Sequence, residues 1–320
     1  MNQSIIGVEI GGTKLQLAIG TPEGQILNLY QGTVNPADGA QGILSWLKIH
    51  ITIVMDQILA SGNKCIAIGC GFGGPIDTIN GRILKSIQIK DWDNFPLKQW
   101  FQDEYHLPAI IANDTNAATW GEYSLGSGRG TRHFFYTNIG SGIGGGIIIN
   151  GSLYDGQGFG AGEFGQTYVP DWTSQVRGAE ERLELLCSGW AIEKRLRLSE
   201  DIPASSVLME LCTGNKKLLD CRMLYQACKL GDKYSLNEIS KVGTSIGIAL
   251  SNVLSLISPE RIALGGGVSN MGELLLEPIR NSVKAHEFIN SVGRYDIVPC
   301  ELKESIVLVG AILLAREVVL

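Results

Sequence analysis

The stretch that decides the fold is IIGVEIGGTKLQLAIG, residues 5–20, in which two short apolar runs flank Gly11-Gly12-Thr13-Lys14. The runs Ile5–Ile10 and Leu15–Gly20 have the length of strands. The glycine-rich connection predicts a hairpin whose turn uses the positive φ angles that glycine tolerates. Another apolar run over residues 25–31 would add a third strand. We therefore predict a three-stranded β-meander over residues 5–31.

The same pattern returns in residues 134–149, FFYTNIGSGIGGGIII, where apolar runs flank Gly140-Ser141-Gly142. Helix and strand patterns alternate after each meander, which predicts an α/β protein with duplicated βββαβαβα halves. We expect two lobes, a smaller one of residues 1–113 plus 306–320 and a larger one of residues 114–305. Nucleotide and substrate would bind in the central cleft between them.

The remaining elements follow from the period of the apolar residues. Helical spacing predicts helices over residues 39–60, 97–104, 113–123, 180–196, 217–229, 236–256 and 306–315. Short apolar runs predict strands over residues 65–72, 109–112, 261–264 and 296–299.

The two glycine turns are candidates for phosphate binding. Phosphoryl transfer requires backbone N–H groups that approach phosphate oxygens, and residues without a Cβ permit that approach. Each turn alone is more often a plain hairpin turn. Because they occupy matching places in a duplicated pattern, Gly11-Gly12-Thr13-Lys14 and Gly140-Ser141-Gly142 together predict a clamp on the phosphates of one nucleotide.

Asn113-Asp114 lies where an apolar strand ends and a helix begins. One interpretation is a helix N-cap. The other is catalytic, because a carboxylate at the carboxyl edge of an α/β sheet lies where ligands bind. The helix dipole favours the ionised carboxylate, which can accept a proton as a hydroxyl attacks a phosphate. The local sequence leaves both interpretations open.

Charge and hydropathy exclude several classes of protein. The net charge of −6 and the pI near 5.3 provide no basic face for nucleic acid. The sequence over residues 1–14 has no signal-peptide pattern, and the apolar segment 306–315 is too short to span a membrane. We therefore expect a cytoplasmic protein with no nucleic-acid partner and no membrane partner.

Six ordered blocks of this sequence resemble the ROK family, whose members are sugar kinases and sugar-responsive repressors. The resemblance covers nearly the whole chain. The blocks are Gly7–Lys14, Gly71–Asp77, Ala112–Ala118, Asn138–Gly146, Gly162–Gly165 and Leu264–Ser269.

The resemblance implies an actin-like ATPase fold of the ribonuclease H-like, hexokinase type, an ATP-dependent sugar kinase that uses Mg²⁺, and a homodimer. It implies that Asp114 is the general base, taking the proton from a sugar hydroxyl, normally the 6-OH, as it attacks the γ-phosphate. It places Gly74, Asn113, Glu163 and Glu184 at sugar hydroxyls, and Gly265-Gly266-Gly267 at the adenosine side of the nucleotide.

This chain departs from the family pattern at three places. Glu9 stands where the family usually has an aspartate associated with Mg²⁺ and its waters, and a longer carboxylate can still accept from a metal-bound water. Gln166 replaces a histidine of the family's zinc motif, and residues 167–182 contain no cysteine, so we predict no structural zinc. Gln88 replaces an asparagine that contacts sugar. The identity of the sugar therefore stays open.

The primary hypothesis is a glucokinase-like enzyme, because Asn113, Asp114, Glu163 and Glu184 suit a hexopyranose. Gln88 and Gln166 favour a kinase for another sugar or a cyclitol, such as fructose, an amino sugar or a carbocycle. A sugar-binding pseudoenzyme is a third hypothesis, motivated by Glu9 and the missing zinc motif. A repressor would need a helix-turn-helix segment before the first glycine turn, and in this sequence six residues precede Gly7 at the start of the block that contains this turn.

Overall fold

The computed structural model describes residues 2–86 and 89–319, which form two compact units. The first unit comprises the described residues of Met1–Gly130, Gly146–Gly162 and Glu301–Leu320, and the second comprises Thr131–Gly145 and Glu163–Cys300. The lobe boundaries expected from the sequence stay a prediction.

The first unit is built on a five-stranded sheet of order β3-β2-β1-β4-β7. Its strands are β1 (Gln3–Ile10), β2 (Lys14–Gly20), β3 (Ile26–Thr33), β4 (Lys64–Phe72) and β7 (Ala109–Asn113). Strands β1, β2 and β3 pair antiparallel, and β4 and β7 continue the sheet in parallel. The predicted meander is therefore confirmed. A small separate hairpin pairs β5 (Ile76–Asp77) with β6 (Arg82–Ile83).

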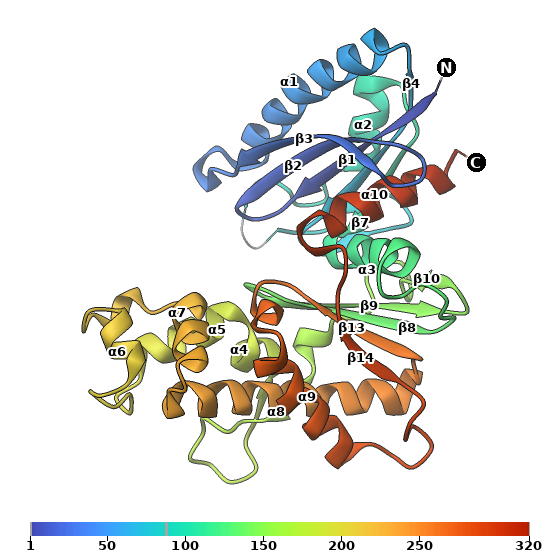
Figure 1. Cartoon of the computed structure of the whole chain (residues 1–320). Helices are drawn as coiled ribbons and strands as arrows, with labels where there is room; N and C mark the ends of the chain where they lie inside the picture. Colours follow the sequence, from blue (N-terminus) through green and yellow to red (C-terminus); the bar gives the residue numbers. More distant parts are fainter. Residues whose placement is uncertain (1, 87–88, 320) are drawn as a thin grey trace. The chain divides into compact units, whose positions relative to one another are not determined.

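Helices cover both faces of this sheet, which explains why β1 and β2 are almost continuously buried. The helices are α1 (Gly39–Ala60), α2 (Leu97–Tyr105), α3 (Asp114–Leu125) and α10 (Ile306–Glu317) (Figure 1). Side chains alternate between faces along β1: Ile6 and Val8 join the core that contains α1, whereas Ile5 packs with Ile312 of α10.

Helix α10 packs closely against α3 and β4. A Cβ atom added to Gly310 would overlap the carbonyl oxygen of Ala117 in α3, and one added to Gly69 in β4 would overlap the carbonyl oxygen of Ala311. The backbone of α10 is therefore in close contact with the backbone of α3 and with that of β4. The predicted last helix is a structural part of the first unit.

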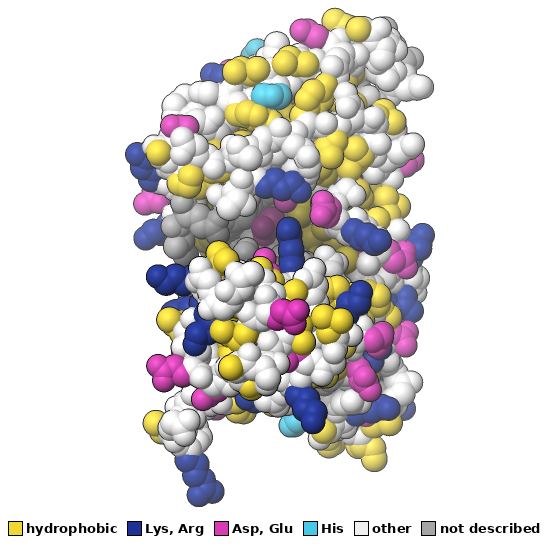
Figure 2. Space-filling view, turned by 60° about the vertical axis from the view of Figure 1, so that its left-hand side comes forward, with side chains coloured by type: hydrophobic (Ala, Val, Ile, Leu, Met, Phe, Trp, Pro, Cys, Tyr) yellow, Lys and Arg dark blue, Asp and Glu magenta, His cyan; other side chains and the backbone are white. Residues whose placement is uncertain are grey.

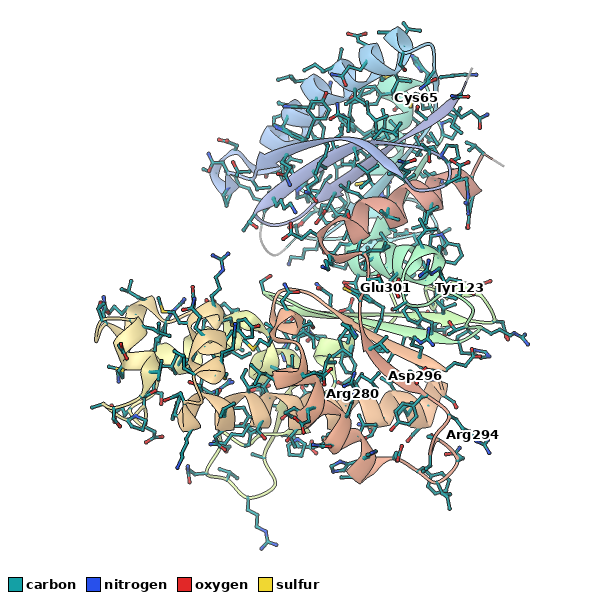
Figure 3. The ribbon with its side chains drawn as sticks, in the orientation of Figure 1. Cys65, Tyr123, Arg280, Arg294, Asp296 and Glu301 are labelled. Atoms are coloured by element: carbon teal, nitrogen blue, oxygen red, sulfur yellow. The ribbon has the colours of Figure 1, made fainter. Side chains whose placement is uncertain are left out.

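Glu122 of α3 fixes the segment that leads into α10. Its side chain is fully buried and accepts hydrogen bonds from the backbone N–H groups of Ser127, Glu301 and Leu302 at 2.9, 2.7 and 3.1 Å. Figure 3 shows Glu301 beside α3. A buried carboxylate needs such donors, because an unpaired charge in the interior would be strongly destabilising.

The second five-stranded sheet has the order β10-β9-β8-β13-β14, which repeats the order of the first. Its strands are β8 (Phe134–Ile139), β9 (Ile143–Ile149), β10 (Ser152–Tyr154), β13 (Arg261–Gly265) and β14 (Asp296–Pro299). Strands β13 and β14 extend the sheet from β8 in parallel, as β4 and β7 do from β1. The repeated strand order confirms the duplication predicted from the two hairpin patterns.

Two helical predictions in the second unit were wrong in extent. Residues 180–196 contain β12 (Glu180–Arg182), α4 (Leu183–Cys187) and α5 (Gly189–Leu198), because Ser188 is extended and caps α5 through Ala191 N. Strand β12 pairs with β11 (Tyr168–Pro170). In residues 217–229 the α-helix covers only α7 (Cys221–Lys229), since Asp220 starts that helix by capping Met223 N. The short helix α6 (Val207–Leu211) was not predicted.

Helices α8 (Lys233–Ile257) and α9 (Glu273–His286) pack along each other in the second unit (Figure 1). Arg280 of α9 donates to the carbonyl oxygen of Ile297 in β14, and Figure 3 shows Arg280 near the strand that carries Asp296. The 3-10 turns are Pro36–Asp38, Phe164–Gln166, Lys216–Leu218, Val268–Met271 and Lys303–Ser305.

Two helical stretches, Pro36–Ala60 and Lys233–Ile257, are long and apolar enough to cross a membrane by length and composition alone. Core helices of soluble proteins meet the same criterion. The most apolar 18 residues are 33% buried in Pro36–Ala60 and 61% buried in α8, and the buried apolar residues of α1 belong to the core of the first unit.

Asp232 caps α8 and connects it to α6. Its carboxylate accepts from Ser235 N and Oγ at 2.9 and 2.6 Å, from Ser206 Oγ at 3.0 Å and from Val207 N at 3.1 Å. Partial burial by itself raises the pKa of this carboxyl, but the hydrogen bonds together outweigh burial and hold the pKa below its usual value. The ionised form is therefore favoured by folding.

We expect Asp232→Ala to lower the free energy of unfolding by about 1–2 kcal/mol at pH 7. The pKa of Asp232 is lower in the folded protein than in the unfolded chain, where it is about 3.9. The stabilisation is therefore present above about pH 3.9 and is lost as the pH falls through the pKa of the folded state. Urea unfolding at pH 7 and near pH 3 measures the difference, which should shrink at the lower pH. Asp201→Ala, at an exposed aspartate, is the control. An equal loss at both pH values would contradict this account.

Candidate active site

The first glycine turn joins β1 to β2 in the first unit. Gly11 N donates to Lys14 O at 3.0 Å, which closes the turn, and Val34 N donates to Thr13 O at 3.0 Å. Neither Gly11 nor Gly12 adopts a positive φ, so that prediction was wrong. A Cβ on Gly11 would lie 3.2 Å from Lys14 O. Glycine at position 11 is thus explained by close backbone approach rather than by a left-handed conformation.

Glu9 lies on β1 two residues before this turn, and its Oε2 is buried without a hydrogen bond among the described residues. Burial raises the pKa of its carboxyl to about 7; the charge of Lys14 opposes this, and the charges of Asp114 and Glu304 raise the pKa further. A buried carboxylate oxygen without a donor suits a cation or a metal-bound water. Glu9 therefore fits a contact to Mg²⁺ through water.

Asn113 and Asp114 have separate roles at the start of α3. The N-cap is Asn113, whose Oδ1 accepts from Thr115 N at 2.9 Å and from Asn116 N at 3.3 Å. Its Nδ2 donates to Gly74 O at 3.1 Å. Asp114 is the first helical residue, and its Oδ1 accepts from Thr115 N at 2.7 Å. The capping interpretation therefore applies to Asn113.

Gly73 lies beside Asp114 and was not selected from the sequence. Gly73 N donates to Ile10 O at 2.8 Å, and a Cβ at this residue would lie 3.3 Å from Asp114 Oδ2. A larger residue would crowd the carboxylate. The only sequence signal for Gly73 is its place within the glycine-rich block 71–77.

The second glycine turn is braced by α4 and α5 of the second unit. Gly140 N donates to Gly142 O at 2.9 Å, and Gly189 N donates to Gly140 O at 2.7 Å. A Cβ on Gly142 would lie 2.7 Å from Glu184 Oε2, which accepts from Ile143 N at 2.8 Å. The turn and Glu184 are therefore held together, a contact that the sequence did not predict.

Glu163 and Gln166 lie near Glu184 in the same unit. Gln166 Nε2 donates to Glu184 Oε1 at 3.4 Å, and Gln166 N donates to Glu163 O at 3.0 Å. Burial raises the pKa of the Glu163 carboxyl, and the charge of Glu184 raises it further. The structure thus gathers two carboxylates and an amide, groups that together can accept from and donate to hydroxyls.

Gly265 is the last residue of β13, and Gly266 and Gly267 follow it, so the predicted glycine turn lies at the end of this strand. Gly266 has φ +87°, and a Cβ there would lie 2.5 Å from the carbonyl carbon of Ile139. Glycine is thus required at position 266 by both conformation and space. Ser269 Oγ donates to Gly265 O at 2.6 Å and closes the turn.

The predicted residues therefore form two groups. The first unit holds Glu9, Gly11, Gly12, Thr13, Lys14, Gly74, Asn113 and Asp114, and the second holds Gly140, Ser141, Gly142, Glu163, Gln166, Glu184 and Gly265 to Gly267. Gln88 lies outside the described residues. Within the described part of the chain, no three His, Cys, Asp or Glu side chains form a metal-binding group.

Two sheets of the same duplicated strand order define the actin-like ATPase class of fold, which confirms the fold class predicted from the sequence. The ROK family model matches residues 5–318, so the chain belongs to the ROK family. It is 30% identical to the glucokinase of Thermotoga maritima over 98% of this chain and 97% of that protein. It is 29% identical to the β-glucoside kinase of Listeria monocytogenes over 85% of each chain.

A solved structure supports the same relationship. The ROK family glucokinase from Streptomyces griseus, crystallised with glucose and AMPPNP, has a TM-score of 0.80 to this chain and 30% sequence identity. The likeness covers 98% of this chain and 99% of that one.

Proposed function

We propose that this chain is an ATP-dependent sugar kinase that phosphorylates a sugar hydroxyl, the 6-OH of glucose or of a related hexose, with Asp114 as the general base. The observation that carries the proposal is the placement of Asp114 at the start of α3, where Asn113 already provides the helix cap. Membership of the ROK family and similarity to glucokinases over nearly the full length support the same activity.

In the proposed reaction, the sugar hydroxyl oxygen forms a bond to the γ-phosphorus of ATP while the bond from that phosphorus to the β,γ-bridging oxygen breaks. ADP is the leaving group, and the hydroxyl proton passes to the Asp114 carboxylate. Positioning and charge stabilisation supply most of the acceleration in phosphoryl transfer, so a modest base suffices.

The nucleotide phosphates would bind the two glycine turns, Gly11-Gly12-Thr13-Lys14 and Gly140-Ser141-Gly142, and the adenosine would bind at Gly265-Gly266-Gly267. Backbone N–H groups at such turns donate to phosphate oxygens. Glu9 would hold Mg²⁺ through a bound water, and the ion would neutralise charge on the phosphates. The buried, unsatisfied Oε2 of Glu9 supports this assignment.

The sugar would bind Gly74, Asn113, Asp114, Glu163, Gln166 and Glu184, with Gln88 as a further contact. Asn113 is already oriented by its bond to Gly74 O, and Glu184 by its bond from Ile143 N. Prepositioned polar groups of this kind determine orientation and specificity in sugar sites. We also propose that the enzyme is a cytoplasmic homodimer, as the family resemblance implies.

Figure 2 shows Lys and Arg side chains interspersed with Asp and Glu over the face in view. Nucleic-acid binding proteins concentrate positive charge in a stripe or patch. Over the described residues of the face in view, the positive charge is not concentrated in this way.

The test is ADP release by the purified chain with Mg-ATP across a panel of hexoses, amino sugars, β-glucosides and cyclitols. We expect one sugar to give a kcat/KM at least about tenfold above the others, since buried polar groups discriminate strongly between hydroxyl patterns. Turnover of glucose would identify a glucokinase, and turnover of another sugar or a cyclitol would identify the alternative kinase. Sugar binding without turnover of any member would overturn the kinase and identify a pseudoenzyme.

A further inference from the structure

The side-chain amide of Gln166 lies between two partners of opposite hydrogen-bonding character. Arg182 Nη1 donates to Gln166 Oε1 at 3.0 Å, while Gln166 Nε2 donates to Glu184 Oε1 at 3.4 Å. A guanidinium can only donate, and a carboxylate can only accept. A flipped amide would oppose donor to donor and acceptor to acceptor, so only one orientation satisfies both partners.

Backbone pairing brings Arg182 to this place although sixteen residues separate it from Gln166. In the β11–β12 hairpin, Tyr168 pairs with Arg182, and Leu183 N donates to Thr167 O at 2.8 Å. Thr167 and Tyr168, which follow Gln166, are thereby paired through their backbone with Leu183 and Arg182. Arg182 is therefore placed by the sheet rather than by its flexible side chain alone.

Glu184 is held from its other side. Its Oε2 accepts from Ile143 N at 2.8 Å, which leaves Oε1 as the oxygen that Gln166 approaches. The amide of Gln166 has a second N–H, which neither of these two bonds uses. A hydroxyl placed next to the pair could therefore donate to Glu184 and accept from Gln166.

We propose that Arg182 is a positioning residue for sugar recognition. Its guanidinium holds the Gln166 amide with the N–H groups directed toward Glu184. Gln166 can then donate to a sugar hydroxyl while Glu184 accepts from the same hydroxyl. This inference rests on the proposed function. The Arg182 side chain is 43% exposed, so the hydrogen bond contributes at the level of a solvent-accessible contact. Such a contact corresponds to a change in affinity of about 3- to 10-fold.

The first test is a double-mutant cycle on the full chain, with the sugar identified by the panel. We expect Arg182→Ala to raise the KM for sugar about 3- to 10-fold with kcat changed less than about twofold, because ground-state and transition-state binding are lost equally. In a Gln166→Ala background, the same substitution should change KM by less than about twofold. Arg182→Lys should restore part of the affinity, since an ammonium also donates to Oε1.

The control is Arg177→Ala, which removes an exposed arginine from the loop between β11 and β12 and should leave KM unchanged. An equal KM rise from Arg182→Ala in both backgrounds would show that Arg182 does not act through Gln166 and would overturn the inference.

A second test does not depend on turnover. The side-chain amide signals of Gln166 in the ¹⁵N-labelled, sugar-free protein report its hydrogen bonds directly. We expect Arg182→Ala to shift these signals and Arg177→Ala to leave them in place. Unchanged signals in Arg182→Ala would overturn the positioning role, whereas a wild-type chain that phosphorylates no sugar would overturn only the proposed function.

Discussion

Asp114→Asn is expected to lower kcat for sugar phosphorylation by a factor of about 10²–10⁴, the usual contribution of a general base. The amide is nearly isosteric with the carboxylate, so Oδ1 can still accept from Thr115 N, and Asn113 still caps α3. The amide cannot take the hydroxyl proton, however. Dissociation constants for sugar and for the nucleotide should change by less than about threefold, because the loss falls on the transition state.

Steady-state ADP release and calorimetric binding on the same preparations measure these two effects separately. Asp103→Asn, at an exposed aspartate of α2, is the matched control and should retain wild-type kcat. If Asp114→Asn kept kcat within about tenfold of wild type while folding normally, another group would have to accept the proton.

Gly310→Ala is expected to destabilise the first unit by about 3 kcal/mol or more. The added methyl group would overlap the carbonyl oxygen of Ala117, and it would also lie 3.1 Å from Gly121 N. Both are backbone atoms of α3 that can move only if the helices separate. In an isolated helix, alanine is more favourable than glycine by up to about 1 kcal/mol. A net loss of stability must therefore come from the contact between α10 and α3.

Thermal unfolding followed by circular dichroism measures the change, and we expect the Tm of the first unit to fall by about 6 °C or more. The control is Gly267→Ala, since Gly267 has helical backbone angles and nothing lies within 4 Å of an added Cβ. A Tm within about 2 °C of wild type for Gly310→Ala would mean that α10 can shift away from α3 at little cost.

Much of the fold could be predicted because its strands are strongly apolar and repeat. The two hairpins around Gly11 and Gly140 identified the duplicated meanders, and β1, β2, β8 and β9 lie where their apolar runs predicted. The break at Ser188 was missed, because the helical spacing of the apolar residues runs on through it. Ser188 caps α5 through Ala191 N, and the next residue, Gly189, donates to Gly140 O of the second glycine turn, a contact that local sequence does not reveal.

The candidate site likewise contains residues that could be predicted from the sequence and one that could not. Glycine-rich blocks and the Asn113-Asp114 pair are visible in the sequence because their chemistry is local. Arg182 could not be predicted, because an arginine in a polar stretch is expected to be an ordinary surface residue. Its contact with Gln166 depends on the pairing of β11 with β12. The positive φ expected at Gly11 and Gly12 is absent. At Gly11, glycine instead permits close approach to Lys14 O, and the sequence cannot distinguish this requirement from a left-handed turn.

The position of α10 has a consequence for how the chain acquires its structure during synthesis. Helix α10 covers β1 and β4, yet the ribosome makes it after the whole of Thr131–Cys300. Domains often fold in the order in which they emerge. Here the sheet of the first unit emerges first, but one of its faces stays exposed until residues 306–317 leave the ribosomal exit tunnel. We infer that the second unit completes its core before the first, and that the nascent sheet of β1, β2, β3, β4 and β7 stays incompletely covered until α10 has been made.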